Sequence, residues 1–510
     1  MNRAGRLVSN VLYTLNAKLV LLGLSFVTVP ILVRGLGVEA YGLYALTAVL
    51  IGYFTFLDLG TSQALVKHLS EALARGEQQR AQRLIETGLT LFLSMGVFGG
   101  LVIGALAESF ALSVLHVPST LADAAQVALR LAAVGFTVTM AMNGLLAVPL
   151  ACQRLDIVAK MNAAIGSMGL IIPAILVSTG FSLPSIITTG VLLNVAGVII
   201  LVGVTRRLLP DYKLRFGFDW GEAIRLWKFG GSVLVSTVAA QVSLQVDKLI
   251  ISALLPISRL SYYSVPFNLA AKMLVIPYAV GPALFPAVTE VSALGLSAQL
   301  KGLYLRTTKA LCAVSLPFAL LLLIYADKIL EHWIGADFAV QGTTSLRVLA
   351  VAFFVVLMTQ PATDVARGVG RPGIGAIIAV IDALAMIGFC FVLISWLGID
   401  GAAVAFLLAT NIGAAVFVLI VQRTIVNISA REMLKTSIAR PALAGLGCAA
   451  ALWGLRPLVT GLASLIVVAL VVLASYAAVV FSFVFDRGER STLIDISISF
   501  FRRKSQRGVA

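Results

Sequence analysis

The stretch from Leu32 to Ala72 reads LVRGLGVEAYGLYALTAVLIGYFTFLDLGTSQALVKHLSEA, and the rest of the chain is organised around it. Two long apolar runs meet there at a short turn rich in Gly and Tyr, between Arg34 and Gly42. The second run carries an ionisable residue, Asp58, well inside it. Apolar runs of this length predict helices that cross a membrane, and an ionisable residue at membrane depth is usually paired or functional.

The composition is that of an integral membrane protein. Of the 510 residues, 60% are hydrophobic and 12% are charged, and the mean hydropathy is +1.01. Soluble domains contain only about 45 to 50% apolar residues. The basic N-terminus runs into a long apolar segment without a cleavage-site pattern, so we expect the first helix to be retained. Four cysteines in or beside apolar runs lack any paired spacing, which indicates reduced packing residues: Cys152, Cys312, Cys390 and Cys448.

The length of the apolar runs predicts an all-α polytopic membrane fold. A spanning helix needs about 20 predominantly apolar residues. This criterion predicts fourteen transmembrane helices. They are 11–33, 43–66, 85–107, 125–150, 157–179, 185–204, 230–254, 263–289, 307–325, 344–365, 374–396, 402–421, 441–458 and 463–484.

The placement of basic residues predicts the orientation of these helices. Short cytoplasmic loops are enriched in Lys and Arg. With both termini in the cytoplasm, the predicted outside loops contain only Arg34, Arg259, Lys328 and Arg456 of the 38 basic residues. The net charge of +15 then faces the cytoplasm and anionic membrane lipids, so it does not indicate a nucleic-acid partner.

Internal similarity predicts a duplicated architecture. Residues 36–44 can be aligned with 255–263, and residues 153–157 with 370–374, at offsets of 219 and 217. Two matches at nearly one offset favour two six-helix repeats that share one topology. The predicted organisation is an N-terminal six-helix bundle (1–204), a basic cytoplasmic linker (205–229), a C-terminal six-helix bundle (230–421), two additional helices (441–484) and a basic cytoplasmic tail (485–510).

Three short motifs resemble a known transporter family. They are the turn RGLGVEAYGLY at 34–44, the segment LDLG at 57–60 and the pair QR at 153–154. They resemble the Wzx-type polysaccharide-exporter branch of the multidrug/oligosaccharidyl-lipid/polysaccharide (MOP) exporter superfamily. The resemblance implies a flippase of the bacterial inner membrane that translocates an undecaprenyl-pyrophosphate-linked glycan for O-antigen or exopolysaccharide biosynthesis. It also implies polysaccharide polymerase machinery as a further partner.

Two ionisable residues lie at similar depth in the first two predicted helices. Lys18 lies 7 residues from the inner end of its span and Asp58 lies 8 residues from the inner end of its own. Both are therefore about 11 to 12 Å deep, at about 1.5 Å per residue. They are candidates for an ion pair, which would either bridge the helices structurally or act as a gate that opens during transport.

Cations outnumber carboxylates in the predicted outer halves of three further helices. Lys248 follows Asp247 in the span 230–254, and Lys272 lies at a similar depth in the next span. Asp247 can neutralise only one of these lysines, and Arg130 adds a third cation. Ammonium and guanidinium groups facing a shared cavity would bind a pyrophosphate. We therefore predict substrate binding by Lys248, Lys272, Arg130 and Lys18, with structural ion pairs as the alternative.

The span 263–289 has an unusual backbone. Pro277, Pro282 and Pro286 each remove a helical hydrogen bond and predict kinks. Such breaks at membrane depth persist only against protein or a water-lined cavity. The segment is either a moving part of the transporter or a static kink.

The sequence predicts no metal site, nucleotide site or cofactor. The three histidines lie far apart, and neither a zinc motif nor a Gly-rich phosphate loop occurs. The sequence does not indicate what powers transport. Coupling to a proton or a sodium ion through Asp58 or Asp247 is a hypothesis.

Three classes of function compete for this sequence. A lipid-linked oligosaccharide flippase working by alternating access would need surplus positive charge for the pyrophosphate. A cation-coupled exporter of small drugs, from the sister branch of the superfamily, would more naturally need carboxylates near the path. A membrane-embedded sugar polymerase or ligase usually needs a large extramembrane loop, and the longest outside loops here are short. The surplus of deep cations favours the flippase, a transporter and not an enzyme.

Overall fold

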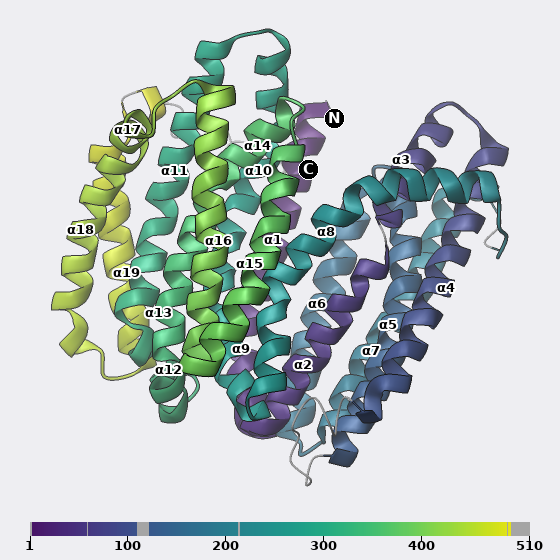
Figure 1. Ribbon diagram of the computed structural model, residues 1–510, viewed down its shortest axis with the longest axis horizontal. Coiled ribbons are helices and arrows are strands. Elements are labelled where there is room, and N and C mark those ends of the chain that lie inside the picture. Colours follow the sequence, from purple (N-terminus) through teal and green to yellow (C-terminus); the bar gives the residue numbers. More distant parts are fainter. Residues whose placement is uncertain (1–2, 59, 110–121, 213–214, 487, 491–510) are drawn as a thin grey trace, which may run out of the picture. The chain divides into compact units, whose positions relative to one another are not determined.

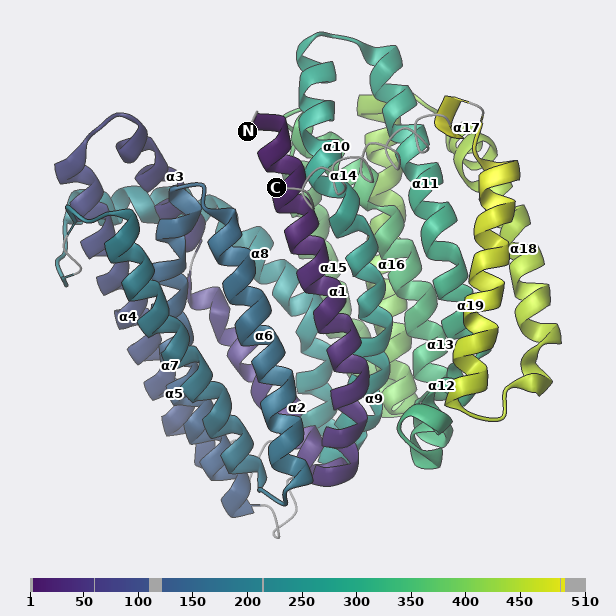
Figure 2. The same cartoon turned by 180° about the vertical axis from the view of Figure 1, so that it is seen from behind.

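The computed structural model describes residues 3–58, 60–109, 122–212, 215–486 and 488–490. Side chains are described from Lys18 onward, except at 53–56, 106–109, 229, 231–237, 278–283 and 285–286. Every regular element in these ranges is a helix (Figures 1 and 2). Of the basic tail that the sequence predicts at 485–510, residue 487 and residues 491–510 lie outside the described residues.

The chain divides into two compact units. Unit 1 is built from Met1–Ala279 and Gly373–Gly413. Within it α1 packs on α6, α4 and α7 pack on α5, and α8 packs on α15, so that apolar faces are buried between long helices. Its elements are α1 (Arg3–Leu36), α2 (Val38–Phe54), η1 (Thr55–Asp58), α3 (Thr61–Ala74), α4 (Gln78–Ser109), α5 (Ala122–Ala151), α6 (Leu155–Ser178), α7 (Leu183–Leu208), α8 (Trp220–Leu254), α9 (Ile257–Ala271), η4 (Lys272–Leu274), the start of α10 (Val275–Ala293), α15 (Gly373–Leu397) and most of α16 (Ile399–Val421).

Unit 2 is built from Val280–Pro372 and Ala414–Ala510. Its helix α11 packs on both α13 and α18, and α18 packs on α19. Besides the ends of α10 and α16, its elements are α11 (Ser297–Ile324), α12 (Ala326–Trp333), α13 (Ala336–Met358), α14 (Gln360–Gly368), η5 (Gln422–Val426), α17 (Ala430–Met433), η6 (Leu434–Ile438), α18 (Ala439–Gly454), η7 (Arg456–Leu458), α19 (Leu462–Val479) and η8 (Val480–Val484).

The described residues contain ten helices that are long and apolar enough to cross a membrane. Each coincides with one of the fourteen predicted spans. The other four predicted spans fall on α2 to α3, on α8, on α9 to α10 and on α18, all of which are helical. A multi-pass helical membrane protein is therefore confirmed, whereas the count of fourteen and the cytoplasmic termini stay predictions.

The turn in the opening stretch is tighter than the sequence predicts. A single residue, Gly37, separates α1 from α2, and its φ of 80° is a left-handed conformation that favours glycine. The start of α2 packs on α9, where Ser261 Oγ donates a hydrogen bond of 2.5 Å to the carbonyl of Val38. The two segments aligned as a repeat, 36–44 and 255–263, thus lie against each other within unit 1.

Two predicted spans are broken by short 3₁₀ segments. The first break is η1 between α2 and α3, and the second is η4 between α9 and α10. At η4 the cause is Pro277, which has no N–H to donate to the carbonyl of Met273, four residues earlier. At η1 the chain turns at Gly60, whose φ is 71°. The second break begins 217 residues after the first, at Lys272 after Thr55, which equals one of the two offsets of the predicted repeat.

The basic linker is held against α4 through polar contacts. Arg215 forms an ion pair with Glu86, and the Asp219 amide donates to Thr87 Oγ1 at 3.0 Å. Asp219 then begins α8 by accepting a hydrogen bond of 3.0 Å from the Glu222 amide. This bond holds the pKa of Asp219 below its ordinary value.

We expect Asp219 to stabilise the fold above about pH 4 and to lose this effect in acid. Because its pKa is lower in the folded chain than in the unfolded chain, where it is about 3.9, the contribution disappears as the pH falls through the folded pKa. Asp219→Ser keeps a helix cap but removes the charge. The difference in melting temperature between wild type and this variant should shrink below pH 4. Asp211→Ser, at an exposed carboxylate of the same linker, is the control.

Candidate functional site

A buried charged cluster joins α8 to α9 inside unit 1. Asp247 and Lys248 of α8 are 0% and 4% exposed, and Tyr263 of α9 is 0% exposed. Lys248 Nζ lies 3.2 Å from Asp247 Oδ1, and Tyr263 donates its hydroxyl to Asp247 Oδ2 at 2.5 Å. The carboxylate is thus engaged on both oxygens, by a cation and by a hydroxyl.

The ammonium of Lys248 has further partners beside the carboxylate. Its side chain folds back along α8, and Nζ donates to the carbonyl of Leu244 at 2.7 Å. On its other side Nζ lies 3.5 Å from the centroid of the Phe267 ring, a cation–π arrangement. Phe267 in turn meets Phe406 of α16 edge to face. A buried charge with this set of partners is satisfied by the protein, so binding of a ligand by Lys248 would require its ion pair to open.

Lys272 has the opposite environment. It begins η4, where the helix is broken, and its side chain is exposed. Its ammonium forms no hydrogen bond or ion pair with any residue that the structure describes. Of the two lysines that the sequence places at similar depth, Lys248 is therefore neutralised by Asp247, and Lys272 is the surplus cation.

The remaining predicted site residues lie elsewhere in unit 1. Asp58 is half-buried at the end of η1 and accepts a hydrogen bond of 2.9 Å from the Ser62 amide, in the first turn of α3. Lys18 is half-buried on α1, and Arg130 is exposed on α5. The ion pair of Lys18 with Asp58 stays a prediction, as do the roles of Lys18 and Arg130.

Three residues of this region were outside the predicted site. Tyr263 and Phe267 complete the cluster, but neither carries a charge that would single it out at the level of sequence. Asp382 of α15 is half-buried at membrane depth and packs its carboxylate against the backbone of Gly413 in α16. It makes no hydrogen bond with the described part of the chain. Its signal in the sequence is its position in the middle of a span.

The fold is that of a multi-pass membrane transporter. The structure of the lipid II flippase MurJ in an inward closed conformation has a TM-score of 0.70 to this chain, at 12% identity, covering 93% of this chain and 99% of that one. An inward-facing multidrug resistance MATE transporter of the MOP superfamily has a TM-score of 0.63, at 14% identity, covering 84% and 99%. At these identities the likeness concerns the fold alone.

The family is given by the sequence itself. Residues 31–341 match the family described as "Polysaccharide biosynthesis protein", and the chain belongs to this family. A Shigella flexneri protein named as an O-antigen transporter is 22% identical over 73% of this chain and 88% of its own length. A Haloferax volcanii protein named as a low-salt glycan biosynthesis flippase is 23% identical over 75% and 76%. The predicted resemblance to a polysaccharide-exporter family is confirmed.

Proposed function

We propose that this protein is a flippase that moves a polyprenyl-pyrophosphate-linked oligosaccharide across the bacterial inner membrane. Family membership, a fold like that of MurJ, and relatives named as an O-antigen transporter and a glycan flippase support this assignment. All four proteins compared above are named as transporters or flippases, which disfavours the polymerase or ligase alternative. Undecaprenyl is the carrier that the resemblance to bacterial polysaccharide exporters implies.

The exposed Lys272 at the break of a spanning segment is the observation on which we base the head-group site. A cation at membrane depth is unfavourable by about 2.5 to 3.5 kcal/mol unless water or an anion accompanies it. The broken backbone at η4 has the same requirement, because its freed carbonyls need protein or water. A pyrophosphate would neutralise the Lys272 ammonium, and water that enters with it could donate to the carbonyls; Lys18 and Arg130 are further candidates to bind the pyrophosphate.

Alternating access needs elements that bend, and the two broken spans provide them. The backbone at η1 and at η4 lacks the regular i to i−4 hydrogen bonds of an α-helix, so bending there breaks fewer bonds than bending elsewhere. Lys272 lies in the second break and Asp58 in the first. A ligand or ion that binds to Lys272 or Asp58 would therefore contact the chain at a place where it can bend.

For coupling to a proton or a sodium ion, we propose Asp58 rather than Asp247 as the binding carboxylate. Asp247 is engaged by Lys248 and Tyr263, whereas the Asp58 carboxylate accepts one hydrogen bond from the described residues. It therefore keeps acceptor capacity for a proton or a sodium ion. A flux that is equal in wild type and Asp58→Asn, with and without each gradient, would remove this part of the proposal.

Replacing Lys272 by Gln should slow flipping at least about tenfold, since one charge-assisted contact to the pyrophosphate is worth about 1.5 to 3 kcal/mol. We would measure the transbilayer movement of a fluorescent polyprenyl-pyrophosphate sugar in proteoliposomes. Lys160→Gln removes another exposed cation, near the start of α6, and is the matched control. Flipping at the wild-type rate in Lys272→Gln would exclude the head-group site but not the flippase.

The second candidate function is a cation-coupled exporter of small molecules. The half-buried carboxylates Asp58 and Asp382 favour it, because an organic cation or a coupling ion would seek such groups. The same proteoliposomes distinguish the two functions. Counterflow of small organic cations, without movement of any polyprenyl donor, would assign the protein to this branch.

A further inference from the structure

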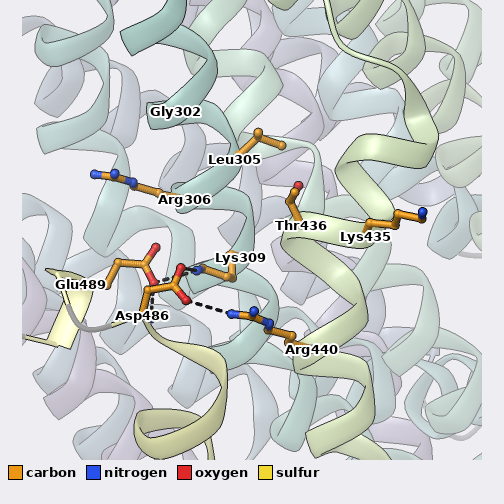
Figure 3. A pocket seen from close by; sticks show the side chains of 9 residues that line it. All are labelled: Gly302, Leu305, Arg306, Lys309, Lys435, Thr436, Arg440, Asp486 and Glu489. Carbon is orange, nitrogen blue, oxygen red and sulfur yellow. Dashed lines mark hydrogen bonds and ion pairs between the residues drawn. The ribbon is translucent and has the colours of Figure 1, made fainter.

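Unit 2 contains a basic cavity that has no part in the function proposed above. It has a volume of about 320 Å³ and opens between the first half of α11, the turn η6, the start of α18 and the segment that follows η8. Figure 3 shows its side chains. Four cations and two carboxylates line it: Arg306, Lys309, Lys435, Arg440, Asp486 and Glu489.

The two carboxylates neutralise two of the four cations. Lys309 Nζ, on a nearly buried side chain, lies 2.6 Å from Glu489 Oε2 and 3.4 Å from Asp486 Oδ2. Arg440 Nη1 lies 2.8 Å from Asp486 Oδ1 (Figure 3). The hydrogen bond from Arg440 lowers the pKa of Asp486, so this carboxyl group is charged at neutral pH. Anionic groups from the chain's own C-terminal segment therefore already occupy one side of the cavity.

The other two cations are left over. Arg306 of α11 and Lys435 of η6 are exposed and form no ion pair with the described residues. In Figure 3 Arg306 is on the same side of the cavity as the two carboxylates, and Lys435 is on the other side. Both side chains are long and can turn over the cavity without giving up a partner. The cavity thus has a surplus of two positive charges and flexible arms to close over an anion.

The cavity lies at the edge of the predicted hydrocarbon layer. Three predicted spans end beside it, at residues 307, 441 and 484, within a few residues of Lys309, Arg440 and Asp486. Each adjoining element also exposes a large apolar side chain: Leu434 in η6, Leu443 in α18 and Phe483 in η8. A phosphate held by the cations would have apolar surface next to it, as the head group of a lipid requires.

The backbone around the cavity is unusual as well. Both η6, which supplies Lys435 and Thr436, and η8, which leads to Asp486, are π-helical turns. Such turns are rare and occur frequently at functional sites. Ser437 Oγ donates to the carbonyl of Leu305 at 2.8 Å and so fixes η6 against α11.

We propose that this cavity binds the phosphate of an anionic ligand, with Arg306 and Lys435 as its binding cations and Asp486 as an internal competitor. Anionic phospholipid of the leaflet next to the cavity and free phosphate share the chemistry that the cavity recognises. Binding here is independent of flipping, because no residue of the proposed head-group site takes part. Because Asp486 competes with the ligand for the cations, removing its charge should strengthen ligand binding, whereas removing Arg306 or Lys435 should weaken it.

The test is lipid retention by the full-length protein, measured by native mass spectrometry with phosphatidylglycerol and with phosphatidylcholine. Arg306→Gln and Lys435→Gln should each weaken phosphatidylglycerol binding about fivefold, the effect of one basic residue near an anionic surface. Asp486→Asn should strengthen it by a similar factor, which a misfolded variant would not do. Arg431→Gln, in α17 and outside the cavity, is the matched control for net charge.

Two results would support the site and identify its ligand. Selective loss of phosphatidylglycerol in the cavity variants indicates a lipid phosphate. Thermal stabilisation by inorganic phosphate that depends on Arg306 and Lys435, without selective lipid retention, indicates free phosphate. Equal binding of both probes by wild type, the cavity variants and Arg431→Gln would overturn the proposal, and so would weaker binding by Asp486→Asn.

Discussion

Asp247→Asn is expected to destabilise the protein by about 3 to 5 kcal/mol, the range found when one partner of a buried ion pair is removed. The Lys248 ammonium is 4% exposed and would keep the Leu244 carbonyl, the Phe267 ring and at most the amide oxygen of the new asparagine. None of these neutralises its charge. The measurement is the free energy of unfolding in detergent micelles, from denaturant titration of wild type and variant.

The control for Asp247→Asn is the double variant Asp247→Asn/Lys248→Met. Methionine has nearly the shape of lysine without its charge, so the double variant buries no unpaired ion. Replacing both partners of a buried pair is often neutral, so this variant should be more stable than Asp247→Asn alone. Equal stability of Asp247→Asn and wild type would show that the pair is not buried in the membrane.

The order of the helices was predictable because the membrane imposes a simple rule on the sequence. Each helix that crosses a bilayer needs a long run of apolar residues, and such runs can be recognised directly in the sequence. The break at Lys272 was predictable for a similar reason, since Pro277 removes a backbone donor wherever it lies. The break at Thr55 was not, because Gly60 alone does not distinguish a left-handed turn from a glycine within a helix.

The pairing within the site could not be predicted from sequence. Neighbouring residues on a helix point in different directions, so Asp247 and Lys248 are not expected to face each other. They meet because the lysine stem folds back along α8, which depends on the Phe267 ring from α9. The hydroxyl of Tyr263 also comes from that neighbouring helix. Contacts of this kind follow from how helices pack, which the apolar pattern of one helix does not specify.

Gly60→Ala is expected to destabilise the protein by about 2 to 5 kcal/mol, from two separate costs. The first is conformational, because the φ of 71° costs a residue with a side chain about 1 to 2 kcal/mol. The second is steric: a Cβ at this position would lie 2.6 Å from the carbonyl oxygen of Gly230 in α8 and 2.9 Å from its Cα. These are backbone atoms, which cannot rotate away, so α3 and α8 would have to move apart. Overpacking of this kind typically costs about 1 to 3 kcal/mol more.

Gly37→Ala separates these two costs. Gly37 has a similar φ of 80°, but nothing lies within 4 Å of the position that its Cβ would take. This variant should therefore lose only the conformational part, about 1 to 2 kcal/mol. Both variants are compared with wild type by denaturant titration in the same detergent. If Gly60→Ala loses no more stability than Gly37→Ala, then α3 does not depend on its close approach to α8, and the break at η1 is held by Gly60 alone. If it loses more, the packing of α3 on α8 fixes the first break, just as Pro277 fixes the second, so that the two breaks have different causes.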